Sequence, residues 1–186
     1  QAAAAPPSPL RIGFSTASPL GTPVDPEAIR AVEAAARLLE DLGHSVEEAQ
    51  PRMDMRQMCL DWLYVWFAQC AALVTQVRAE TGCGSGAFEA DTLAMIAVGR
   101  HLSADRYALH QGRWQQYMIA LDEFLADYDF WLTPTLAMPP ASIGAFDTPV
   151  WQGRVLRTAL KLGAGGLLAR SGEVERLALK SLEAVP

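Results

Sequence analysis

The first part of the chain constrains the fold most, because a strand, a helix and a second strand follow one another there. Residues 10–14 (LRIGF) alternate apolar and polar side chains, as a short strand does. The Asp-Pro-Glu motif at 25–27 predicts a helix start, and Gly43 predicts its end. Residues 45–48 predict a second strand. This order predicts two parallel neighbouring strands joined by a right-handed crossover.

The middle of the chain predicts a helical insert over about 53–127. Residues 53–79 are apolar nearly all round in their middle, so this helix is expected to be buried on most sides. Residues 81–87 (TGCGSGA) predict a flexible connector, because no strand precedes them and no lysine follows as in a phosphate-binding loop. Two further helices are expected over 91–102 and 104–126.

The remainder of the chain predicts a third strand and a helical end. Residues 127–133 (DYDFWLT) are expected to enter the sheet, and the prolines that follow favour a loop. Two helices are expected over 149–169 and 173–183. The predicted fold is therefore α/β, with a partial, mostly parallel sheet and helices packed on it. The expected organisation is a linker, an α/β segment and a helical C-terminal piece, at 1–9, 10–150 and 151–186.

Charge and length exclude some classes of protein. The 186 residues carry a net charge of -6, and the 15 basic residues are spread along the chain, so we expect no nucleic-acid partner. The most apolar stretch, residues 59–74, is shorter than the roughly 20 residues of a membrane span, so we expect no membrane contact. Free cysteines in a cytoplasmic protein are the simplest interpretation of three widely spaced cysteines.

No residue pattern in the chain predicts a catalytic or metal centre. There is no Gly-x-Ser-x-Gly motif. His44, His101 and His110 lack metal-ligand spacing, so they are expected to be surface or helix-end residues and we expect neither metal nor cofactor. Asp61 lies among aromatic residues and needs a partner if it is buried.

An aromatic run on the long helix has two interpretations. Trp62, Tyr64, Trp66 and Phe67 could belong to the core, as aromatic residues at helical spacing usually do, or could line a substrate pocket. Sequence alone leaves both open.

Two blocks of sequence resemble one enzyme family. The first, LRIGFSTASPLGTPVDPEAIRAVEAAARLLEDLGHSVEEAQP, resembles the segment that follows the catalytic core of amidase-signature hydrolases. The second, YDFWLTPTLAMPPASIG, resembles a later strand and loop of that family. They occur in family order with a helical insert between them, and the resemblance covers 10–144. Within the family, the sequence of the first block is most similar to the bacterial branch that includes 6-aminohexanoate cyclic-dimer hydrolase.

The resemblance implies hydrolysis of carboxylic amides without a metal. It implies a serine nucleophile, a second serine in a cis peptide, a lysine base and an oxyanion hole of backbone amides. Those residues lie on an earlier stretch in the family. This chain has no Ser-Ser pair, and its two lysines, Lys161 and Lys180, come too late. We therefore expect an internal or C-terminal piece that holds no catalytic residue.

The resulting expectation is a part of an amidase that supplies scaffold and is inactive alone. The residues expected to line the substrate pocket are Trp62, Trp66, Thr133 and Thr135. The expected partner is a small-molecule amide in the intact enzyme, and exposed apolar surface favours self-association into a homo-oligomer. The alternatives are a non-catalytic α/β binding module, with the aromatic helix as its partner groove, and a subunit fragment of an amidotransferase acting on aminoacylated tRNA. The acidic composition gives the last no support.

Overall fold

The computed structural model describes residues 8–18, 20–140, 142–144 and 147–182. Most of the expected linker over 1–9, and the end of the last expected helix, lie outside these residues. Contacts between residues divide the chain into two compact units. We call them the sheet unit (Gln1–Arg56, Gln115–Ala141 and Leu182–Pro186) and the helical unit (Gln57–Trp114 and Ser142–Ser181). The domain bounds expected from the sequence stay a prediction.

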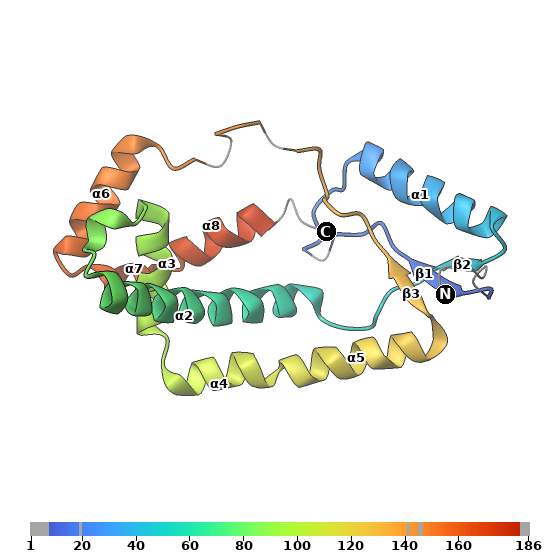
Figure 1. Ribbon diagram of the computed structural model, residues 1–186, viewed down its shortest axis with the longest axis horizontal. Helices are drawn as coiled ribbons and strands as arrows, with labels where there is room; N and C mark the ends of the chain where they lie inside the picture. The colour runs from blue at the N-terminus through green and yellow to red at the C-terminus, as the bar shows by residue number, and fades with distance from the viewer. Residues whose placement is uncertain (1–7, 19, 141, 145–146, 183–186) are drawn as a thin grey trace. The chain divides into compact units, whose positions relative to one another are not determined.

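The sheet unit confirms the predicted parallel sheet. Its three strands are β1 (Arg11–Phe14), β2 (Ser45–Glu48) and β3 (Phe130–Leu132). They lie in the order β2-β1-β3, and both pairs are parallel, with Ile12 opposite Val46 and Phe130 (Figure 1). The chain is thus α/β: mostly helical, with a small parallel sheet of three strands.

Helix α1 (Pro26–Asp41) joins β1 to β2 and begins where the sequence predicts. The Asp25 side chain accepts a hydrogen bond of 2.7 Å from the backbone N–H of Glu27, which satisfies one of the free amides of the first turn. Val32 and Ala36 are the buried residues of this helix. Gly43 follows with a positive φ of 89°, a conformation that glycine adopts at little cost.

Helix α5 (Trp114–Asp127) returns the chain to the sheet, where one glycine allows a close approach. A Cβ at Gly13 of β1 would lie 2.6 Å from Cζ of Phe124, so only glycine leaves room for this ring against the strand. The same ring stacks on Tyr128 with a centroid distance of 4.6 Å. The sheet unit therefore packs an aromatic pair directly over its central strand.

Asp129 fastens β3 to β1 through both backbone and side chain. Its N–H donates to the carbonyl of Arg11 at 2.7 Å, and its carboxylate accepts the N–H of Arg11 at 2.7 Å. The bond from this backbone amide, followed by the charge of the Arg11 side chain, lowers the pKa of Asp129. Asp129 therefore has a structural role at the start of β3.

We predict that Asp129→Asn weakens the sheet unit at neutral pH only. Because the folded pKa is lowered, the bond stabilises the fold above the unfolded value of about 3.9 and is lost as pH falls through the lowered folded value. Urea midpoints of the native and Asp129→Asn chains should therefore differ at pH 7 and converge once the pH falls below the lowered folded pKa of Asp129. A difference that persists unchanged in acid would contradict the assignment.

The helical unit holds the longest helix, α2 (Met55–Thr81). It is followed by a short 3-10 turn η2 (Ser85–Ala87), and then by α3 (Ala90–His101) and α4 (Ala104–Gly112). After a loop come α6, α7 and α8, which span Val150–Lys161, Gly165–Ser171 and Glu173–Leu182. Helix α3 contacts both α6 and α7 (Figure 1). A core cluster joins α2 to α3 through Ala71, Val74, Leu93 and Ile96.

Two expectations for the helices are wrong. The helix predicted over 104–126 is interrupted at Arg113, which separates α4 from α5. The interruption follows Gly112, a weak helix former, and the Arg113 side chain is bonded to another helix as described below. Helix α2 is not buried on most sides in the described chain, because Trp62 and Leu73 are 39% and 60% exposed.

Among the described residues, α2 is the one helix long and apolar enough to cross a membrane by length and composition. Core helices of soluble proteins meet the same criterion. Asp61, in the second turn of this helix, is fully buried and hydrogen-bonded to His110 and Arg113, so this part of α2 packs against protein.

Candidate functional site

A buried polar cluster in the helical unit is centred on Asp61 of α2, which is 0% exposed. Its Oδ1 accepts from Nε2 of Gln57 at 2.9 Å and lies 2.7 Å from Nδ1 of His110. Arg113 donates to both carboxylate oxygens, from Nε at 2.8 Å and from a terminal nitrogen at 2.9 Å. The two-point contact is the strong geometry for an arginine and a carboxylate.

These contacts fix the proton positions in the cluster. A carboxylate that takes two bonds from a guanidinium is ionised and accepts only. Nδ1 of His110 therefore carries a proton and donates to Asp61. His110 lies in the last turn of α4, which agrees with the expected helix-end position, but it is buried there, with 7% of its surface exposed. Asp61 has the partners that the sequence analysis required of a buried aspartate.

Tyr64 extends the cluster toward the last helix. Its ring stacks on His110 with a centroid distance of 4.4 Å, and the guanidinium of Arg106 lies 5.0 Å from the ring centroid. The Tyr64 hydroxyl donates to the carboxylate of Glu175 in α8. Burial, and then the bond to Glu175, raise the pKa of Tyr64. Side chains from α2, α4 and α8 are thus held together by one polar network.

An aspartate paired with a histidine forms two members of a catalytic triad. Whether this pair could be catalytic depends on whether a nucleophilic side chain contacts the histidine. Within the described part of the chain, no serine, threonine or cysteine side chain hydrogen-bonds His110. The ring is instead covered by Tyr64. The arrangement can hold helices in register, and it lacks a nucleophile.

The aromatic run on α2 divides between core and surface. Phe67 is 0% exposed and belongs to the core. Trp62 and Trp66 stack on each other, with centroids 5.5 Å apart and planes at 10°, and Trp62 is exposed. The sequence placed both tryptophans in a substrate pocket, and the structure brings these two together as a flat apolar surface. Their role in a pocket stays a prediction.

Thr133 and Thr135 lie in the sheet unit, on the segment that leaves β3. Both are exposed, and Pro134 between them is buried. The segment is fixed at its start, where the N–H of Ser15 donates to the carbonyl of Leu132 at 3.0 Å. The carboxyl ends of neighbouring parallel strands are where open α/β sheets bind ligands, so the position of both threonines suits pocket lining.

The sequence analysis missed the partners of Asp61. His110 and Arg113 lie 49 and 52 residues further along the chain, beyond any helical spacing. A signal was nevertheless present. An aspartate inside an apolar helix needs a counter-charge, and a histidine and an arginine three residues apart share one face of a later helix.

The cysteines have no activating surroundings. Burial raises the pKa of the Cys59 and Cys70 thiols. In the described ranges, no group of three or more histidine, cysteine, aspartate or glutamate residues could hold a metal ion.

We predict slow alkylation of Cys59 and Cys70 by iodoacetamide at about pH 7.5, because a raised pKa leaves little thiolate at that pH. Mass spectrometry of timed samples measures the rate at each cysteine. The urea-unfolded chain is the control and should react several-fold faster at both positions. Equal rates in the folded and unfolded chains would contradict the prediction.

Three parallel strands with a long helical insert between the second and third are the class of fold found in amidase-signature enzymes. The chain matches a structure of 6-aminohexanoate cyclic dimer hydrolase with a TM-score of 0.71 and 23% identity, over 77% of this chain and 31% of that one. A structure of this hydrolase complexed with substrate matches with a TM-score of 0.70 and 22% identity, over 92% and 36%.

The chain belongs to the amidase family, whose model matches residues 1–177. A lipoamidase of Enterococcus faecalis is 28% identical over 137 residues, which are 71% of this chain and 18% of the lipoamidase. The chain therefore spans about a fifth of that relative and about a third of the two solved structures.

Proposed function

We propose that this chain is part of an enzyme that hydrolyses carboxylic amide bonds through a serine nucleophile, and that it supplies scaffold and pocket lining. The amidase family match over 1–177 supports amide hydrolysis as the reaction. One similar protein is named as a lipoamidase, and a solved structure of similar fold is named as a 6-aminohexanoate cyclic dimer hydrolase. The substrate is a small-molecule amide, and the enzyme works in the cytoplasm without nucleic acid or membrane.

One observation supports the proposal that the catalytic residues lie outside this chain: the described residues contain no activated nucleophile. The sequence has no Ser-Ser pair. Among the residues with described positions, no serine or cysteine side chain hydrogen-bonds a histidine or a lysine. The best-formed acid–base pair, Asp61 with His110, is buried and covered by a tyrosine. The chemistry is therefore assigned to residues outside these 186.

The residues proposed for pocket lining are Trp62 and Trp66 in the helical unit and, separately, Thr133 and Thr135 in the sheet unit. The stacked tryptophans offer a flat apolar surface for an acyl chain. The threonines follow a strand at the carboxyl edge of the sheet, where their hydroxyls can bond a polar group of the substrate.

A serine-reactive fluorophosphonate tests the proposal directly. We predict no labelling of the 186-residue chain and no hydrolysis of aryl or short-chain amides above background, because an unactivated serine reacts with neither. The same probe should label the polypeptide as its gene encodes it, at a serine that precedes Gln1. Circular dichroism of the chain provides the check that it is folded during the assay.

Turnover or labelling by the chain itself would refute the assignment of the chemistry. A gene that encodes no Gly-Ser-Ser-rich stretch and no lysine ahead of Gln1 would instead favour the non-catalytic binding module.

A further inference from the structure

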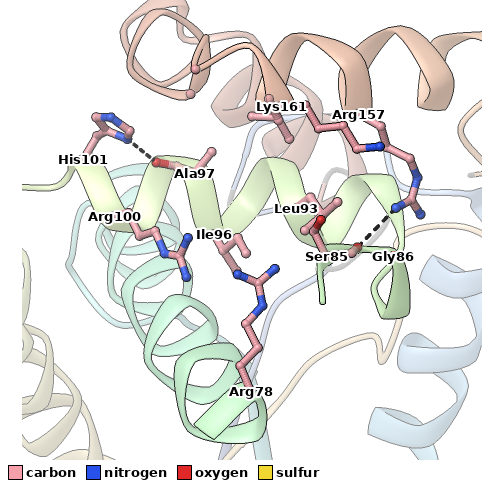
Figure 2. Close-up of a pocket in the computed structure, with 13 residues that line it drawn as sticks. Arg78, Ser85, Gly86, Leu93, Ile96, Ala97, Arg100, His101, Arg157 and Lys161 are labelled. Atoms are coloured by element: carbon pink, nitrogen blue, oxygen red, sulfur yellow. Dashed lines mark hydrogen bonds between the residues drawn. The ribbon is translucent and has the colours of Figure 1, made fainter. Parts of the chain in front are cut away.

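A cavity of about 620 Å³ in the helical unit is lined both by apolar side chains and by four cations. The apolar side chains come from α3 and α6 and are Leu93, Ile96, Ala97 and Leu160. The cations are three arginines and one lysine: Arg78, Arg100, Arg157 and Lys161. Figure 2 shows them reaching the cavity from three helices, α2, α3 and α6. Four cations gather here in a chain whose net charge is -6.

None of these four cations forms an ion pair with a carboxylate in the part of the chain that the structure describes. Arg157 donates to the backbone carbonyls of Phe88 at 2.6 Å and Ser85 at 3.4 Å. The guanidinium of Arg78 lies 5.3 Å from the ring centroid of Phe88, and its Nε is buried without a hydrogen-bond partner. The positive charge of the cavity is therefore not neutralised by a described side chain.

Helix ends account for part of this charge, though not for all of it. Arg78, Arg100 and Lys161 each lie in the last turn of a helix, where a cation interacts favourably with the helix dipole. Each helix end is equivalent to roughly half a negative charge. The three helix ends together therefore offset about one and a half of the four positive charges, so the cavity keeps a net positive charge.

We propose that this cavity binds an organic anion with an apolar chain. A carboxylate or phosphate head group would lie among the cations, since guanidinium groups bond such oxygens in pairs. The apolar chain of the ligand would lie against the apolar lining residues of α3 and α6. The volume lies within the roughly 300–1,000 Å³ of small-molecule pockets. The proposal does not depend on amide hydrolysis, because it concerns binding alone.

The choice of variants follows from what else the cations contact. Arg157 also lines a second hollow that contains Glu89, Asp91 and Asp147, and it holds the backbone near η2, so it is left unchanged. Arg100 and Lys161 line only the first cavity, and both are exposed. Arg100→Gln with Lys161→Gln removes two positive charges at little structural cost.

Isothermal titration with sodium octanoate tests the proposal on the protein as the cell makes it. One saturable site per chain is expected, with weaker binding as sodium chloride rises, because salt screens the head-group contact. Octyl phosphate should compete for the same site, and the tighter of the two probes identifies the head group. Acetate has no chain and 1-octanol has no charge, so each should bind at least roughly 10-fold more weakly, equivalent to about 1.4 kcal/mol.

The matched control removes the same charges elsewhere in the helical unit. Arg170→Gln with Lys180→Gln changes two exposed cations that do not line the cavity. We expect octanoate affinity to fall roughly 10-fold in the Arg100 and Lys161 variant and to stay unchanged in this control, with circular dichroism spectra alike. Equal affinity in both variants, equal affinity for 1-octanol, or no saturable site would overturn the proposal.

Discussion

Replacing Asp61 with alanine is expected to lower the free energy of unfolding by about 3–5 kcal/mol, because it breaks a buried ion pair. The variant leaves the buried imidazole of His110, and the guanidinium of Arg113, which is 34% exposed, without the carboxylate they share. A typical domain has only about 5–15 kcal/mol of stability, so the loss is a large share of the total. Urea unfolding followed by circular dichroism measures it.

Two further variants separate the buried pair from a general effect of the substitution. Asp122→Ala removes an exposed aspartate of α5 and should change stability by less than about 0.5 kcal/mol. Asp61→Ala combined with Arg113→Ala should cost less than the sum of the two single variants, because the second change removes the charge that the first leaves behind. Similar losses for Asp61→Ala and Asp122→Ala, or strict additivity, would show that the pair is not what stabilises this site.

The parts of the fold that the sequence predicted are those set by local signals. The Asp-Pro-Glu motif at 25–27 locates the start of α1 because capping depends on neighbouring residues only. The first strand was predicted from alternating apolar and polar residues, and the second from its position shortly after the glycine that ends the helix. A strand–helix–strand order already implies parallel pairing of these two strands. The third strand was expected only to enter the sheet, and its place beside β1 is a finding of the structure.

The parts that the sequence did not predict depend on how helices pack. Asp61 was recognised as needing a partner, but nothing local selects His110 and Arg113 from the other cations of the chain. The cationic cavity was missed for the same reason. Arg78, Arg100 and Lys161 each look like an ordinary helix-end residue in sequence, and only the packing of α2, α3 and α6 brings them round one cavity.

The candidate pocket residues illustrate an intermediate case. Helical spacing correctly placed Trp62 and Trp66 on one face of α2, because residues four apart are neighbours on a helix. Spacing could not decide that Phe67 is in the core while Trp62 is exposed. That difference arises from which side of the helix meets α3, a tertiary contact.

Replacing Gly99 with alanine is the second change with a large expected effect, a loss of about 3 kcal/mol. A Cβ at Gly99 would lie 2.5 Å from the backbone carbonyl carbon of Phe67 and closer still to its oxygen, where real contacts stay beyond 3.0 Å. Backbone atoms cannot rotate away as a side chain can, so α2 and α3 must separate at the point where Phe67 is fully buried. The gain in helix propensity, about 1 kcal/mol, does not compensate.

Gly112→Ala provides the matched control, because it makes the same substitution in a helix with open space around it. A Cβ at Gly112 meets no atom within 4 Å, so the substitution changes only the helix propensity of this position. The free energy of unfolding should therefore rise by up to about 1 kcal/mol. Opposite signs for the two glycine variants in urea unfolding would locate the close contact of α2 and α3 at Gly99. A gain at both positions would mean that these helices lie further apart than the structure places them, and the cavity lined by α2, α3 and α6 would then have a different shape.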